Sequence, residues 1–183
     1  MSTGRPRATS RDTIAEAASE LFLEQGYAQT TVADITQRAG VSRSSFFNYF
    51  SSKADVLWAG LDARIETLTD RLSGGASVSD SLQVLGDAFA PDSLALALVH
   101  AEAMGLGDEL VREAGVRRSR IASAVAARLR VDGAAAISAE VAGAAHAGAV
   151  LAAIEAWARA GAGQAPLGPL LDEALDAAAS TLP

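Results

Sequence analysis

Apolar residues recur at helical spacing along almost the whole chain. Between residues 10 and 25 they occupy one face of a helix, at Ile14, Ala17, Ala18, Leu21 and Phe22. Similar patterns follow over residues 31–39, 42–50, 54–72, 77–90, 93–104, 108–130, 134–160 and 167–182. The sequence therefore predicts an all-α protein of about nine helices.

Glycine and hydroxyl residues separate the first three helical patterns. Gly26 ends the first pattern, and Thr31 can cap the second. Gly40 supplies the backbone freedom of a tight turn, and Ser42 can cap the third helix. Three helices with a Gly-containing turn between the second and the third make a helix-turn-helix unit.

The third helix has two chemically different faces. Phe46 and Phe50 are four residues apart, so both can point into a core. The other face carries Arg43, Ser44, Phe47 and Asn48. Such a short helix with an outward polar and aromatic face indicates an external partner.

We expect three regions. Residues 1–9 form a flexible basic arm, residues 10–53 a three-helix helix-turn-helix head, and residues 54–183 a helical bundle body. The turn and the recognition helix span 39–50, and a long helix over 54–72 joins head to body. The arm is either a disordered terminus or an extended segment that enters the DNA minor groove.

Charge is distributed unevenly between these regions. The chain carries a formal net charge of −7, which by itself disfavours a polyanionic partner. Through residue 53, however, six basic residues face five acidic ones, a net of 6 − 5 = +1, while the remainder carries 9 − 17 = −8. This distribution is compatible with DNA binding through the head alone.

The residues from Ile14 to Leu57 resemble the DNA-binding domain of the TetR family of bacterial regulators. The matching positions are Ile14, Ala17–Ala18, Leu21–Phe22, Glu24, Gly26–Tyr27, Thr30–Thr31–Val32, Asp34–Ile35, Ala39–Gly40–Val41–Ser42, Phe46, Tyr49–Phe50, Ser52–Lys53 and Leu57. The sequence departs from the family at two positions. Many members have tyrosine at the position of Phe47 and histidine or a larger residue at that of Asn48.

Roles at a DNA surface follow from the chemistry of the side chains. Arg43 can pair with both major-groove acceptors of guanine, and Thr31 lies at a helix N-terminus that favours phosphate. Phe47 can contact a thymine methyl or a sugar. By resemblance, Tyr49 and Lys53 contact the backbone. The predicted DNA-binding residues are Thr31, Ser42, Arg43, Ser44, Ser45, Phe47, Asn48, Tyr49 and Lys53.

The resemblance implies that the body binds a small-molecule effector between its helices. The abundance of alanine and leucine and the shortage of basic residues favour an apolar or cationic effector over an anionic one. Candidate lining residues, each of which could equally be ordinary core, are Trp58, Phe89, Leu96, His100, Met104 and Val125.

The resemblance also implies a homodimer in which the two C-terminal helices pair with their two-fold mates. Small residues allow a close approach of another helix at Ala139, Gly143 and Ala147, and again at Ala144 and Gly148. Such stripes can also pack within one subunit. The predicted interface residues are Gly143, Ala147, Leu151, Ile154, Trp157, Leu171 and Leu175.

The sequence offers little apparatus for catalysis. It has no cysteine, and its two histidines, His100 and His146, are isolated from ligand-spaced partners. It contains no Gly-rich phosphate loop, nucleophile elbow or zinc-protease motif. We therefore expect no enzyme activity, no metal and no cofactor.

Neither an uninterrupted run of about 18 apolar residues nor a signal-peptide pattern occurs, so we expect a bacterial cytoplasmic protein without membrane contact, nucleoid-associated when bound. The sequence predicts a homodimeric repressor that binds operator DNA and is released by a ligand. An activator of the same family, and an all-helical small-molecule-binding or protein-interaction module without DNA binding, stay open as alternatives.

Overall fold

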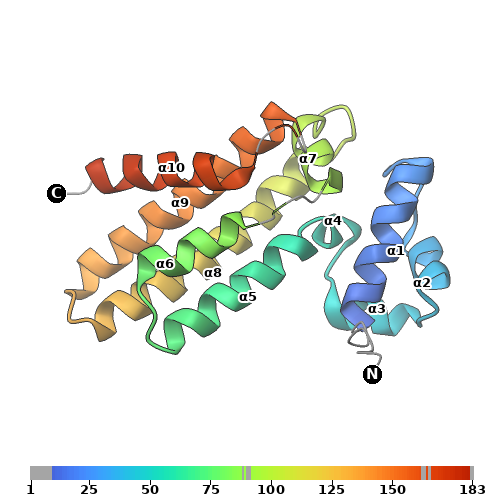
Figure 1. Cartoon of the computed structure of the whole chain (residues 1–183). Helices are drawn as coiled ribbons and strands as arrows, with labels where there is room; N and C mark the ends of the chain where they lie inside the picture. Colours follow the sequence, from blue (N-terminus) through green and yellow to red (C-terminus); the bar gives the residue numbers. More distant parts are fainter. Residues whose placement is uncertain (1–9, 88, 90–91, 162–163, 165, 182–183) are drawn as a thin grey trace, which may run out of the picture. The chain divides into compact units, whose positions relative to one another are not determined.

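A computed structural model describes residues 10–87, 89, 92–161, 164 and 166–181 (Figure 1). The chain divides into two compact units, Met1–Ala59 and Gly60–Pro183. The expected arm, 1–9, lies outside the described residues. The expected boundary was residue 53, whereas the units part after Ala59, so the short helix that begins at Lys53 belongs to the first unit.

The described part of the chain is helical and contains no strand. The first unit holds α1 (Ser10–Gln25), α2 (Val32–Ala39), α3 (Arg43–Tyr49) and α4 (Lys53–Val56). The second unit holds most of α5 (Ala59–Ser73), then α6 (Val78–Gln83), the 3₁₀ helix η1 (Val84–Gly86), α7 (Asp92–Val99), α8 (Gly107–Val131), α9 (Ala136–Ala160) and α10 (Leu167–Thr181).

The first unit follows the predicted pattern closely. The five apolar residues predicted to face inward from α1 are its buried residues. Gly40 has a left-handed backbone with φ of 66°, and Ser42 caps α3 by accepting a hydrogen bond from the Ser45 amide at 3.0 Å. Phe46 and Phe50 are 0% and 2% exposed. The predicted turn and the two-faced recognition helix are therefore present.

The expected single helix over 54–72 is interrupted. After α4, the amides of Leu57 and Trp58 donate to the carbonyls three residues earlier, at 3.2 and 3.1 Å, and α5 starts at Ala59. Residues 56–59 are all buried, so the apolar pattern continues through the break and gives no sign of it. Tighter i→i−3 bonding thus divides the predicted connecting helix into α4 and α5.

Two other predicted helices are shorter in the structure. The pattern over 77–90 becomes α6 and η1, which ends at Gly86. The pattern over 93–104 becomes α7, which begins one residue earlier, so that Ser93 lies inside its first turn, and stops at Val99. Residues 100–105 then form turns, and Gly105 adopts a φ of 65°.

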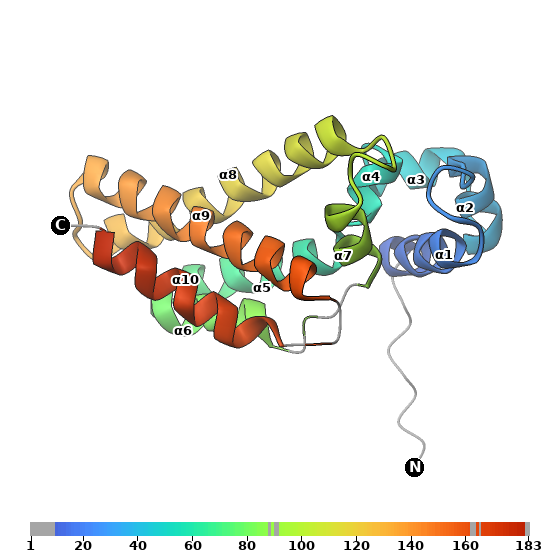
Figure 2. The same ribbon diagram turned by 90° about the horizontal axis from the view of Figure 1, so that it is seen from above.

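In the second unit, α9 is the central helix. It lies between α8 and α10 in both ribbon views and also packs against α7 (Figures 1 and 2). A Cβ built on Gly143 would lie 2.4 Å from the carbonyl oxygen of Ala122 on α8. Only glycine permits so close an approach of the two helix backbones.

By length and mean hydropathy (1.5), α9 could cross a membrane, although polar residues interrupt its apolar run. One such helix is weak evidence for a membrane span, because the core helix of a helical bundle can have the same length and hydropathy. The position of α9 between α8 and α10 accounts for the part of its apolar window that is buried, which is 44%.

Candidate nucleic-acid interface

The exposed face of α3 carries most of the predicted DNA-binding residues. Ser42, Arg43, Ser44, Phe47, Asn48 and Tyr49 are exposed, and Ser45 is half-buried. Phe46 and Phe50, 5.7 Å apart between ring centroids, anchor the opposite face. The local sequence therefore holds a short helix by two aromatic rings and presents the remaining side chains to solvent.

The hydroxyls at the start of α3 are partly engaged with one another. The Ser42 hydroxyl oxygen lies 2.8 Å from that of Ser44 and 3.0 Å from that of Ser45. A hydroxyl that accepts one hydrogen bond can still donate another. This cluster can therefore cap the helix and present polar groups to a nucleic acid at the same time.

Arg43 is the exposed cation of this face. Its guanidinium carbon lies 5.4 Å from the centre of the Phe47 ring. No carboxylate among the described residues forms an ion pair with it, whereas Arg38 pairs with Glu20 at 3.1 Å and with Glu24 at 2.7 Å. The hydrogen bond from Arg38 lowers the pKa of Glu24 below its usual value. The charge of Arg38 is thus neutralised within the head.

Thr31 begins α2 in a reciprocal capping box. Its amide and its hydroxyl donate to the same carboxylate oxygen of Asp34, at 2.8 and 2.7 Å, and the Asp34 amide donates back to the Thr31 hydroxyl at 3.2 Å. These bonds lower the pKa of Asp34. The Thr31 hydroxyl proton is therefore directed at Asp34, and a phosphate contact here falls to the other amides of the first turn.

Lys53 reaches back to the loop between α1 and α2. Its ammonium donates to the carbonyls of Tyr27 at 2.6 Å and Thr30 at 2.7 Å, and lies 3.9 Å from the centre of the Tyr27 ring. Sequence reasoning assigned Lys53 only to a phosphate. The structure adds a role in fixing the loop that leads to Thr31 and the start of α2.

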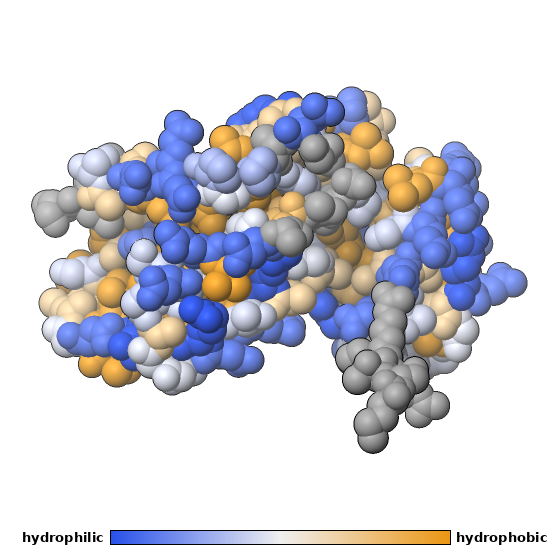
Figure 3. Space-filling model, in the orientation of Figure 1, coloured by the Kyte–Doolittle hydropathy of each residue, from blue (hydrophilic) through white to orange (hydrophobic). Residues whose placement is uncertain are grey.

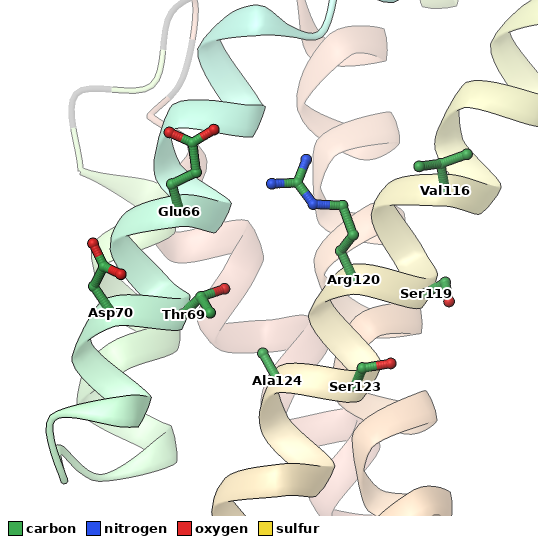
Figure 4. Close-up of a pocket in the computed structure, with 8 residues that line it drawn as sticks. All are labelled: Glu66, Thr69, Asp70, Val116, Ser119, Arg120, Ser123 and Ala124. Carbon is green, nitrogen blue, oxygen red and sulfur yellow. The ribbon is translucent and has the colours of Figure 1, made fainter.

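The second unit has an open groove of about 860 Å³ between α5 and α8 (Figure 4). Arg120 extends from α8 towards α5, which carries two exposed carboxylates (Figure 4). A smaller hollow of about 230 Å³ shares Thr69 and Ala124 with it. The groove is lined by Glu66, Thr69, Asp70, Val116, Ser119, Arg120, Ser123 and Ala124.

A buried charge network joins the two helices that form the groove. Arg117, 2% exposed, donates from Nε and Nη2 to the Asp62 carboxylate at 3.1 and 2.6 Å and from Nη1 to the Glu113 carboxylate. Arg120 donates to Asp62 at 2.7 Å. Two cations thus balance two carboxylates, as burial of charge requires.

Sequence reasoning missed this network. One available signal was the i,i+4 spacing of Glu113 and Arg117. Another was the position of Asp62 between Leu61 and Ile65, on the apolar stripe of α5. An acidic residue within such a stripe indicates a buried partner, but only the fold identifies it as Arg117.

Two family models match the chain. The model described as bacterial regulatory proteins, tetR family, matches residues 14–59, and that of the MftR C-terminal domain matches residues 94–183. Together they cover more than half of the chain. The chain belongs to the TetR family.

Its relatives within the family are regulators, not enzymes. The HTH-type transcriptional regulator TtgR of Pseudomonas putida is 40% identical over 76 residues, which are 42% of this chain and 36% of that protein. The HTH-type transcriptional regulator TcmR of Streptomyces glaucescens is 30% identical over 138 residues, 67% of this chain and 61% of that protein. The chain thus spans less than two thirds of either relative's length.

A solved TetR-family structure resembles nearly the whole chain. The repressor FadR of Thermus thermophilus, in complex with lauroyl-CoA, is 26% identical with a TM-score of 0.53, over 92% of this chain and 93% of that one. The dihydroxyacetone kinase operon activator DhaS has a TM-score of 0.58 at 16% identity, over 94% of this chain and 96% of that one, and shows likeness of fold.

The predicted pocket residues of this TetR-family chain do not line the groove. Trp58 and Val125 are fully buried, and Phe89 packs its ring against Trp157 with centroids 5.1 Å apart. Leu96 is 48% exposed, His100 is exposed in the turn after α7, and Met104 is half-buried. The structure therefore does not gather these six residues around one described cavity.

The predicted dimer residues lie mostly in the core of a single chain. Six of the seven are buried: Gly143, Ala147, Leu151, Ile154, Trp157 and Leu171. Leu175 is half-buried. The stripe of Ala139, Gly143 and Ala147 packs within the body, where Gly143 meets α8.

The second small-residue stripe of α9, which contains Ala144 and Gly148, is accessible at the surface of the protomer. Ile137 and Val141 are 81% and 51% exposed, Ala144 and Ala152 are exposed, and a Cβ on Gly148 would meet no atom within 4 Å. Apolar side chains also reach the surface at the end of the body where α8 leads into α9 (Figure 3). The exposed and the buried stripes thus occupy different faces of one helix.

We predict that Lys53→Met lowers the free energy of unfolding by about 1–3 kcal/mol, because two loop carbonyls lose a charged donor. Chemical denaturation measures this loss, and Lys53→Arg, which retains the charge, is the control.

Lys53→Met should also weaken binding to all DNA sequences alike, and it should reduce the salt dependence of binding by about one phosphate contact per protomer. An unchanged salt slope would assign Lys53 to the loop alone.

Proposed function

We propose that this chain is a homodimeric, DNA-binding transcriptional regulator that acts as a repressor and is released by a small molecule. The observation that carries the proposal is the exposed face of α3, where Arg43 forms no ion pair among the described residues. In a two-fold dimer, two such helices enter successive major grooves about 34–36 Å apart. The protein acts in the bacterial cytoplasm and associates with the nucleoid when it is bound to DNA.

Arg43 reads a guanine, and the exposed groups around it support the contact. A guanidinium donates to both O6 and N7 of guanine, which discriminates it from the other bases in the major groove. Ser42, Ser44, Ser45, Asn48 and Tyr49 contact base edges or the backbone. Lys53 and the free amides of the helix turn that Thr31 caps contact the backbone. Arg38 and Lys53 hydrogen-bond to protein groups at short range, so they are poorer candidates for base reading.

We predict that Arg43→Ala costs about 1–3 kcal/mol of specific binding and relaxes base preference at one position per half-site. Selection of bound fragments from genomic DNA, followed by titration of specific and random duplexes, measures both effects. Arg38→Ala is a matched control, because that charge is already paired with Glu20 and Glu24. Equal losses on specific and random DNA would contradict the role of Arg43.

The same titration separates the alternatives. Failure of the wild-type chain to bind any fragment in a salt-dependent manner would favour an all-helical interaction module without DNA binding. A reporter gene placed behind a selected fragment distinguishes a repressor from an activator. Deletion of the gene for a repressor raises expression of the reporter, whereas deletion of the gene for an activator lowers it.

The dimer forms through α9 and α10, by way of the exposed α9 stripe of Ile137, Val141, Ala144, Gly148 and Ala152. Small residues let two helices approach closely, and exposed isoleucine and valine supply apolar area at one end of the stripe. The buried residues that the sequence pattern suggests for the interface, such as Leu151 and Ile154, pack inside the protomer instead.

We predict that Gly148→Glu shifts the protein from dimer to monomer, because it puts a charge on an apolar contact that the two-fold axis repeats. Sedimentation velocity at micromolar concentration measures the change. Gly115→Glu, at an exposed and equally open position on α8, is the matched control. A wild-type chain that sediments as a monomer, or a Gly148→Glu dimer, would contradict this interface.

The effector binds in the groove between α5 and α8. Two of its lining residues, Glu66 and Asp70, form no ion pair with any described residue, and the charge of Arg120 is offset by Asp62 at 2.7 Å. The groove therefore favours a cationic or apolar molecule over an anionic one. A ligand that prefers one arrangement of α5 and α8 shifts the population towards it, and the coupling to DNA affinity is reciprocal.

We predict that Glu66→Gln combined with Asp70→Asn weakens binding of a cationic amphiphile roughly tenfold. Dodecyltrimethylammonium below its micelle concentration is the cationic probe, and calorimetry measures its affinity. Lauroyl-CoA, the ligand of the similar Thermus thermophilus FadR, is the anionic probe. The matched control is Asp176→Asn, at an exposed position on α10. Tighter wild-type binding of lauroyl-CoA than of the cation would contradict the assigned charge preference.

A further inference from the structure

The side chain of Phe47 is half in contact with the core and half in solvent. The residue is 47% exposed, and its ring meets the ring of Phe46 edge-on, with centroids 5.2 Å apart and planes at 80°. Phe46 is fully buried and in turn packs against Phe50. The orientation of the exposed Phe47 ring is therefore set by aromatic packing that continues into the core.

The ring of Phe47 supports the guanidinium of Arg43. The two residues are four apart on α3, so their side chains lie on the same face, and the guanidinium carbon is 5.4 Å from the ring centroid. Stacking on an aromatic ring uses the flat face of a guanidinium and leaves its N–H donors in the plane. A carboxylate partner would instead occupy those donors, as Glu24 does for Arg38.

We propose that Phe47 is a positioning residue for base readout: it holds Arg43 in the orientation that reads guanine, and contributes to specificity through Arg43. The inference rests on the proposed DNA-binding function. It differs from a direct contact of Phe47 with a thymine methyl or a sugar, because a direct contact is independent of Arg43. The phenyl ring suits this role because its face attracts a cation, which an aliphatic side chain of similar volume does not.

A double-mutant cycle on the full-length protein tests the proposal. Wild-type protein first selects its binding site from a pool of random duplexes. Affinities for that site, for a site changed at the base pair read by Arg43, and for random DNA are then measured for five proteins. These are wild type, Phe47→Leu, Phe47→Tyr, Arg43→Ala, and Phe47→Leu combined with Arg43→Ala.

In an otherwise wild-type chain, Phe47→Leu should lower discrimination at that one base pair roughly two- to five-fold, the factor expected for an exposed cation–aromatic contact. In the Arg43→Ala background the same change should have no effect on discrimination. Phe47→Tyr, which retains the ring, should keep the wild-type preference. Leucine at position 47 can still make an apolar contact with a thymine methyl. A loss of discrimination in Phe47→Leu that depends on Arg43 therefore cannot come from loss of that methyl contact.

Two results would overturn the proposal. An effect of Phe47→Leu that is unchanged in the Arg43→Ala background would show a direct DNA contact, and equal weakening on all three duplexes would show a structural role only. Circular dichroism and thermal melting monitor folding, and Phe47→Met replaces the leucine variant if that variant loses helix content. Wild-type protein that selects no sequence would refute the proposed function itself, which is a distinguishable outcome.

Discussion

Burial of Phe46 and Phe50 determines how the head of this protein works. One ring lies within the seven-residue α3 and the other at its C-cap, and together they fix the rotation of α3 about its axis. Once that rotation is fixed, the side chains of Arg43, Phe47 and Asn48 point away from the core and into solvent. The short helix is stable because of tertiary packing and its Ser42 cap, since isolated helices of this length do not persist in water.

Two other cations of the head, Arg38 and Lys53, have partners within the protein. Arg38 is neutralised by Glu20 and Glu24, and the ammonium of Lys53 holds the loop before α2. A count of charges along the sequence treats these residues as equivalent to Arg43. The structure distinguishes them, because hydrogen-bond donors that are committed within the protein are poorer donors to a base.

The second unit depends on two close contacts of α8. On one side Gly143 lets the α9 backbone approach that of α8, and on the other Arg117 pairs with Asp62 of α5. A buried ion pair of this kind is weak evidence for stability but costly to break, since removal of one partner leaves a buried charge. Arg120 shares Asp62 and is also exposed to the groove, so the charge network extends from the interior to the candidate effector site.

The sequence by itself determined the helical class, the helix-turn-helix with its caps, and the two faces of α3. These features depend on local spacing, glycine conformation and capping chemistry, which residues close together in the sequence determine. The TetR-family assignment followed from the same stretch. The sequence also identified both small-residue stripes of α9.

Tertiary structure alone decided which stripe is buried, because both have alanine and glycine at four-residue spacing and the sequence does not show which of them α8 covers. It likewise decided that the apolar run at residues 56–59 contains a helix break, and that Asp62 meets Arg117, a residue far along the chain. The six pocket residues inferred from the sequence do not line the described groove between α5 and α8. A cavity is defined by the arrangement of several helices and not by the pattern along any one of them.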